Sequence, residues 1–121
     1  MSKIWVAFGG NANLENVERG LDELLSKHPD ATFYCCFLTK EVVTKEGFDP
    51  GAVDLLERKL GDRLEWLLKD YKSLDEVKPD LDKKRFECAR ICDKLCVLDS
   101  DTAKGVTREI EVMSNLKIIL M

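Results

Sequence analysis

One carboxylate in the sequence stands where an enzyme would place a nucleophile. The polar segment Asp99–Glu111 leads into the first turn of an expected helix, and Glu109 falls in that turn. The partial positive charge and free amides of a helix N-terminus stabilise the ionised form of such a side chain. An ionised carboxylate facing a ligand cleft is the group that attacks a sugar at its anomeric carbon. Glutamate is also common at this position for helix capping alone, so both interpretations stay open.

A second segment could contact a ligand through its backbone. Gly9, Gly10 and Asn11 expose amides at the start of another expected helix, where the partial positive charge favours an anion or polar oxygens. The spacing matches neither the dinucleotide fingerprint nor a P-loop, and glycine is also the default residue of a plain tight turn. The ligand-binding residues that we predict are Phe8, Gly9, Gly10, Asn11, Asp99 and Gly105.

Strands and helices alternate along the chain that positions these segments. Apolar runs bounded by glycine, proline or polar clusters predict strands at Lys3–Phe8, Thr32–Leu38, Lys94–Leu98 and Leu116–Met121. Apolar residues at helical spacing predict helices over 14–28, over 51–74, from Lys78 onward and over 107–114. Residues 40–50 lack either period and are expected to form a loop.

Two of these helices have distinct faces. In the helix over 51–74, one apolar stripe holds Val53, Leu56, Leu60, Leu64, Leu67 and Tyr71. In the helix that follows Pro79, one side holds Leu81, Arg85, Cys88, Ala89 and Cys92.

Strands separated by helices predict one α/β domain over 1–121, with a mostly parallel sheet covered on both faces. Right-handed crossovers leave few arrangements, and the simplest is a flavodoxin-like (Rossmannoid) three-layer sandwich with four or five strands in an order near 2-1-3-4. Ligands bind such sheets where the strand order reverses, here between Lys3–Phe8 and Lys94–Leu98. The fold therefore brings the segments 9–13 and 99–105 to one crevice.

Composition excludes several classes of function. The 121 residues are 45% hydrophobic and 35% charged with a net charge of −4, so nothing attracts a nucleic-acid backbone. No apolar run is long enough for a bilayer span and no signal peptide is recognisable, so we expect a cytoplasmic protein without a membrane partner. The five cysteines lack the spacing of a metal site, and we expect buried thiols, no metal and no cofactor.

Two segments carry a family resemblance. Lys3–Gly10, followed by a helix that ends at Lys27-His28-Pro29, looks like the opening of nucleoside 2-deoxyribosyltransferases and of their uncharacterised phage and bacterial relatives. The apolar strand in Cys92–Leu98, then Gly105, then Glu109 four residues later, resembles the second signature of that family. The resemblance implies a flavodoxin-like fold, a homo-oligomer, and cleavage of the N-glycosidic bond of a nucleoside or nucleotide. Glu109 matches the family's nucleophile.

The chain also departs from the family pattern. Ala7 stands where the transferases have a tyrosine, and Arg85 stands near their leaving-base aspartate, with Asp82 and Glu87 as imperfect substitutes. Asp99 or Asp101 would replace the aspartate before the glycine, and we place Asp101 with Glu109 in the predicted catalytic pair. Because groups are missing, the alternative is a sponge or sensor, possibly phage-derived, that binds a nucleotide or ADP-ribose-like metabolite without cleaving it. A third alternative is a protein-interaction domain with a vestigial cleft.

Overall fold

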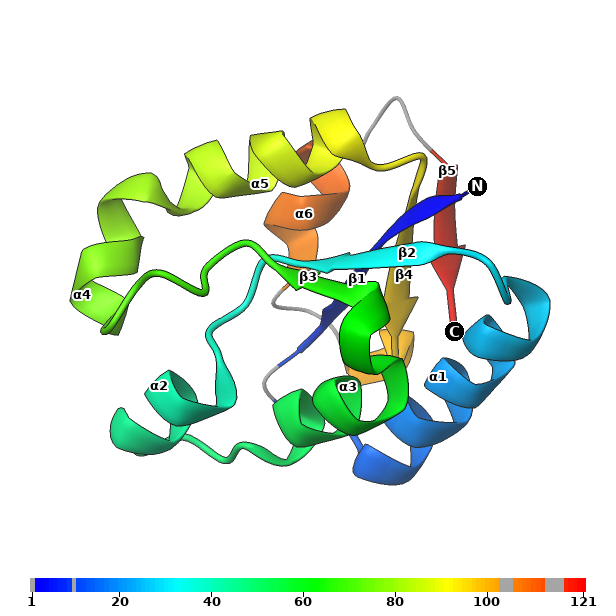
Figure 1. The fold of residues 1–121 in the computed structure, drawn as a ribbon, viewed down its shortest axis with the longest axis horizontal. Coiled ribbons are helices and arrows are strands. Elements are labelled where there is room, and N and C mark those ends of the chain that lie inside the picture. Colours follow the sequence, from blue (N-terminus) through cyan, green and yellow to red (C-terminus); the bar gives the residue numbers. More distant parts are fainter. Residues whose placement is uncertain (1, 10, 103–105, 113–116) are drawn as a thin grey trace.

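The computed structural model describes residues 2–9, 11–102, 106–112 and 117–121. Its centre is a parallel sheet of five strands in the order β3-β2-β1-β4-β5 (Figure 1). The strands are β1 (Lys3–Phe8), β2 (Thr32–Cys35), β3 (Leu64–Trp66), β4 (Lys94–Leu98) and β5 (Lys117–Leu120). The four predicted strands lie in the predicted order, and β3 adds to the outer edge of β2.

Strand β1 occupies the middle of the sheet because almost all of it is apolar. Its residues Ile4 to Phe8 are buried, and they pair in parallel register with β2 on one side and β4 on the other. Phe8 of β1 lies beside Leu98 of β4. From β1 the sheet continues through β2 and β3 on one side and through β4 and β5 on the other, which confirms the predicted reversal point between β1 and β4.

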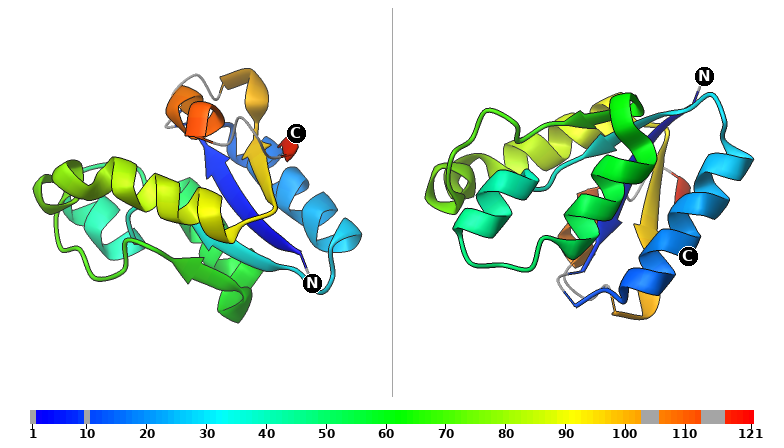
Figure 2. Two further views of the ribbon diagram at one scale, coloured as in Figure 1. Left: turned by 90° about the horizontal axis from the view of Figure 1, so that it is seen from above. Right: turned by 60° about the horizontal axis from the view of Figure 1, so that its bottom comes forward.

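Helices cover both faces of the sheet (Figure 2). Helices α1 (Leu14–Lys27) and α3 (Gly51–Leu60) pack on one face, where Val17, Leu21 and Leu56 are fully buried. Helices α5 (Leu81–Ile91) and α6 (Thr107–Val112) lie on the other face. There Cys88 and Val106 pack against the alternate β1 residues Trp5 and Ala7. The layered fold is thus the predicted three-layer sandwich.

The predicted helix over 51–74 is wrong beyond residue 60. Gly61 adopts φ 52° and ψ −128°, a conformation that only glycine reaches without strain, and α3 ends there. After a 3-10 turn the chain becomes β3, whose buried Leu64 pairs with Phe33. Leucines spaced three and four apart fit a helix. Here, however, the buried Leu64 lies in an edge strand and the buried Leu68 lies in the loop after that strand.

Residues 40–50 are also more regular than predicted. Thr39 caps a short helix, α2 (Lys40–Lys45), through its hydroxyl oxygen, and the buried Val42 and Val43 anchor that helix. Another short helix, α4 (Leu74–Val77), precedes α5. Both short helices lie beyond the carboxyl ends of β1 and β2 (Figure 1).

Other boundaries shift by a few residues. The second strand stops at Cys35 instead of Leu38, and α6 is described to Val112, so the predicted extension to Ser114 lies outside the described residues. Within the described part of the chain, no helix has both the length and the apolar character that crossing a bilayer requires.

Candidate functional site

A cavity of about 430 Å³ opens at the carboxyl ends of β1 and β2. It is enclosed by the end of β1 and the start of α1, by the residues after β2, by α2 and the start of α3, by the loop after β3, by the region from α4 to α5, and by the start of α6. Its volume lies within the range of about 300–1,000 Å³ that small-molecule sites occupy. The lining residues are Trp5, Val6, Ala7, Phe8, Gly9, Ala12, Leu14, Cys36, Phe37, Leu38, Val43, Phe48, Asp49, Ala52, Val53, Leu68, Leu74, Val77, Leu81, Arg85, Val106 and Glu109.

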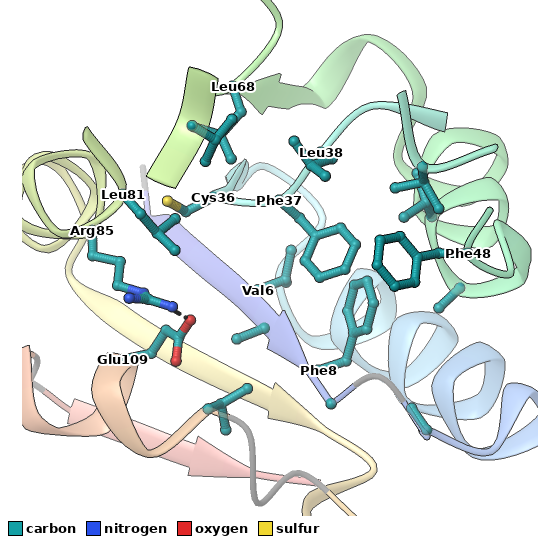
Figure 3. Close-up of a pocket in the computed structure, with 18 of the residues that line it drawn as sticks. Val6, Phe8, Cys36, Phe37, Leu38, Phe48, Leu68, Leu81, Arg85 and Glu109 are labelled. Carbon is teal, nitrogen blue, oxygen red and sulfur yellow. Dashed lines mark hydrogen bonds and ion pairs between the residues drawn. The ribbon is translucent and has the colours of Figure 1, made fainter. Parts of the chain in front are cut away.

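The polar side of the cavity is an ion pair between Glu109 of α6 and Arg85 of α5 (Figure 3). Arg85 Nε donates to Glu109 Oε1 over 3.1 Å, and Glu109 is only 8% exposed. The second oxygen, Oε2, is buried and has no hydrogen-bond partner among the described residues. A buried carboxylate oxygen without a donor is costly, so a hydrogen-bond donor that reached this atom would be stabilising.

Arg85 also pairs with a second carboxylate, that of Asp82. Its Nη1 donates to Asp82 Oδ1 over 3.0 Å, and Arg108 Nη2 donates to the other oxygen of Asp82 over 3.1 Å. These two guanidinium groups, that of Arg108 first, lower the pKa of the Asp82 carboxyl. The network fixes the guanidinium of Arg85 and so fixes which oxygen of Glu109 it occupies.

The opposite side of the cavity is aromatic. The rings of Phe8 and Phe37 lie 4.9 Å apart between centroids with planes tilted by 39°, a favourable arrangement for an aromatic pair. Phe48, which follows α2, adds a third ring and is 55% exposed (Figure 3). The aromatic rings and the Arg85–Glu109 pair face the cavity from different sides.

The structure brings only some predicted site residues together. Phe8, Gly9 and Glu109 line the cavity. Asn11, Asp99 and Asp101 lie outside the lining, and Asn11 and Asp101 are exposed. Gly10 and Gly105 lie outside the described residues. The cavity therefore starts near the predicted crevice at α6 and extends over the β1–β2 side.

Asp99, a predicted ligand-binding residue, binds three groups of the chain itself. Its carboxylate accepts hydrogen bonds from Asn13 N at 2.7 Å, from Asn16 Nδ2 at 3.0 Å and from the Thr102 hydroxyl. The Thr102 hydroxyl and then the Asn13 amide lower the pKa of Asp99. Asn13 also caps α1 through its own side chain, which accepts from Asn16 N. The anion at the α1 N-terminus is thus the protein's own carboxylate.

Asp99→Asn is expected to lower the free energy of unfolding at pH 7 by about 2 kcal/mol, since a neutral amide replaces an acceptor of charge-assisted hydrogen bonds. Asparagine tolerates the positive φ of 48° at this position, so the backbone is not the cause. Because the folded carboxyl has the lower pKa, the wild-type advantage is complete above the ordinary value of 3.8 and is lost as pH falls through the folded pKa. Urea unfolding between pH 7 and pH 3 measures this, with the exposed Asp101→Asn as control.

Sequence reasoning did not assign the residues that shape most of this cavity. For Arg85 the sequence held one indication of a role at a site: its charged side chain shares one side of α5 with apolar residues. Phe37, Phe48 and the leucines read as core or loop residues, and only the tertiary arrangement turns them toward a shared space.

The cysteines are all buried, as predicted, and Cys36 also lines the cavity. Burial raises the pKa of the Cys36 thiol to about 12, so it stays protonated and is a poor nucleophile. Across the described ranges, no cluster of three histidine, cysteine, aspartate or glutamate side chains could hold a metal ion.

Comparisons of the chain with models of protein families, with curated proteins and with solved structures found no match.

Proposed function

We propose that the cavity binds a nucleoside and that Glu109 cleaves its N-glycosidic bond. The observation that carries the proposal is the arrangement of one carboxylate: Arg85 binds Oε1, while Oε2 is buried at the cavity without a described partner. The arginine orients the carboxylate and leaves one oxygen for the ligand. The resemblance to nucleoside 2-deoxyribosyltransferases assigns the same role to Glu109.

The reaction would proceed in two displacements. Glu109 Oε2 attacks the anomeric carbon C1′, the C1′–N bond breaks, and its electron pair leaves with the base, which takes a proton from solvent. Water then attacks C1′ of the glycosyl ester, releases the sugar and returns the carboxylate, or a second base takes the place of water. Arg85 holds the carboxylate in one orientation through both steps.

Charge favours a nucleoside over a nucleotide. Among the described lining residues the charged side chains are Asp49, Arg85 and Glu109, and Arg85 already binds two carboxylates. At the N-terminus of α1, where a phosphate would be stabilised, the Asn13 amide binds Asp99. A phosphate would therefore enter a site with a net negative lining and without a described cation to spare.

One observation favours a second candidate, binding without cleavage. A glycosidase is helped by an acid that protonates the leaving group. Apart from Glu109, the described lining holds one carboxylic side chain, that of Asp49, which is exposed and accepts from Gly51 N over 2.9 Å. The same cavity would then hold its ligand intact.

A panel of nucleosides, their 5′-monophosphates and NAD tests the proposal. The protein is incubated with each compound, and free base is measured by chromatography. The melting temperature of the protein is measured separately in the presence of each compound, under conditions in which the compound is not turned over. Release of base from an unphosphorylated nucleoside, with slower release from its monophosphate, is the expected result. A raised melting temperature without base release would select the second candidate, and neither response to any compound would contradict both.

A further inference from the structure

Besides Arg85 and Glu109, the described lining holds one charged side chain, that of the exposed Asp49, which already accepts from Gly51 N over 2.9 Å, and the rest of the lining is almost entirely apolar. Phe8, Phe37, Leu38, Phe48 and Leu68 line the part of the cavity away from Glu109, and the Arg85–Glu109 pair lies on another side in Figure 3. An unmodified nucleobase carries several hydrogen-bond donors and acceptors around its ring. Burying them against such a lining, without partners, costs free energy for each group.

An apolar substituent reverses this balance. Removing alkyl or aryl surface from water contributes about 25 cal/mol per Å², and aromatic rings gain further from tilted contacts with one another. We infer that the site selects a nucleoside whose base carries an alkyl or aryl substituent. This inference rests on the proposed function, which places the sugar beside Glu109. The apolar lining on the other side of the cavity supports the preference for a substituted base.

Phe48 is the residue that should report this selection. It lines the cavity but is 55% exposed, so a substituent lying against it removes apolar surface of both partners from water. Its backbone is held, since Phe48 N donates to Val43 O over 3.0 Å at the end of α2. An exposed phenylalanine can be truncated without opening the core, which makes Phe48→Ala a usable probe.

Phe86 provides the matched control. It is 54% exposed, lies on α5 and is absent from the cavity lining. Phe86→Ala therefore removes the same side chain at the same exposure from a place where no ligand contact is expected.

The experiment compares N6-benzyladenosine with adenosine by calorimetric titration of Glu109→Gln, which cannot form the glycosyl ester. We expect the benzyl compound to bind at least about tenfold more tightly, and Phe48→Ala to remove most of that difference while Phe86→Ala preserves it. Equal or weaker binding of the benzyl compound overturns the inference. An unchanged preference in Phe48→Ala, or an equal loss in Phe86→Ala, overturns it as well.

A failure of this inference can be distinguished from a failure of the proposed function. Tight, Phe48-dependent binding of N6-benzyladenosine without any base release by the wild-type protein would support the inference and contradict the cleavage. Base release from adenosine, with no preference for the benzyl compound in affinity or in rate, would support the cleavage and overturn the inference.

Discussion

Glu109→Gln is expected to lower the rate of base release about a thousandfold or more, while the dissociation constant of the nucleoside changes by less than about threefold. The amide keeps the shape of the side chain, and its oxygen can still accept from Arg85 Nε. It is not a nucleophile, so the glycosyl ester cannot form. Single-turnover chromatography measures the rate, and calorimetric titration measures the affinity.

Glu111→Gln is the matched control for this variant. Glu111 lies on the same helix, α6, but its side chain is 59% exposed and pairs with Arg108 outside the cavity. The control should keep its rate within about twofold. Base release by Glu109→Gln at a rate near that of the control would remove Glu109 from the chemistry.

Arg85→Met is expected to have the second large effect, a loss of about 3 kcal/mol in the free energy of unfolding. The Glu109 side chain is only 11% exposed, and without the guanidinium both of its oxygens lack a described donor. The double variant Arg85→Met/Glu109→Gln should recover much of this loss, because no buried charge is then left unpaired. Urea unfolding of the two single variants and the double variant measures the coupling.

Arg108→Met serves as the reference for a surface ion pair. Arg108 is 46% exposed and pairs with Asp82 and Glu111, which are 54% and 59% exposed. Its removal should lower the free energy of unfolding far less than Arg85→Met does, because solvent screens these exposed pairs. A cost for Arg85→Met no greater than that of Arg108→Met, or a double variant no more stable than Arg85→Met, would contradict the role of Arg85 as the partner of a buried carboxylate.

The central strands could be predicted from the sequence because each is an apolar run with a clear stop. Lys3–Phe8 ends at Gly9, and Lys94–Leu98 ends at a polar turn, so both boundaries agree with β1 and β4. The edge strand β3 could not be predicted, since Leu64 fits the same three- and four-residue spacing as Leu56 and Leu60. The backbone of Gly61 decides between helix and strand, and glycine alone does not show which conformation it adopts.

The candidate site was predictable only in part. Glu109 and Gly9 follow from the rule that ligands lie at the carboxyl ends of strands where the order reverses. Asp99 obeys the same rule, but two of its three hydrogen-bond donors, from Asn13 and Asn16, come from the distant start of α1, and their approach is a tertiary event. The aromatic side was beyond prediction for another reason: β1 and β2 are neighbours as predicted, but β2 ends at Cys35, before Phe37, and the sequence does not show that Phe37 turns toward Phe8.

The most direct test of the account is the mass of Glu109 after reaction with a slow substrate. A nucleoside with fluorine at C2′ slows hydrolysis of the glycosyl ester, because fluorine destabilises the oxocarbenium-like transition state. Tryptic digestion after Arg108 yields a peptide that starts at Glu109, and fragmentation distinguishes this residue from Glu111. We expect the added mass of the sugar on Glu109 and none in Glu109→Gln. Base release with the sugar on another residue, or with no adduct while the variant remains active, would contradict it.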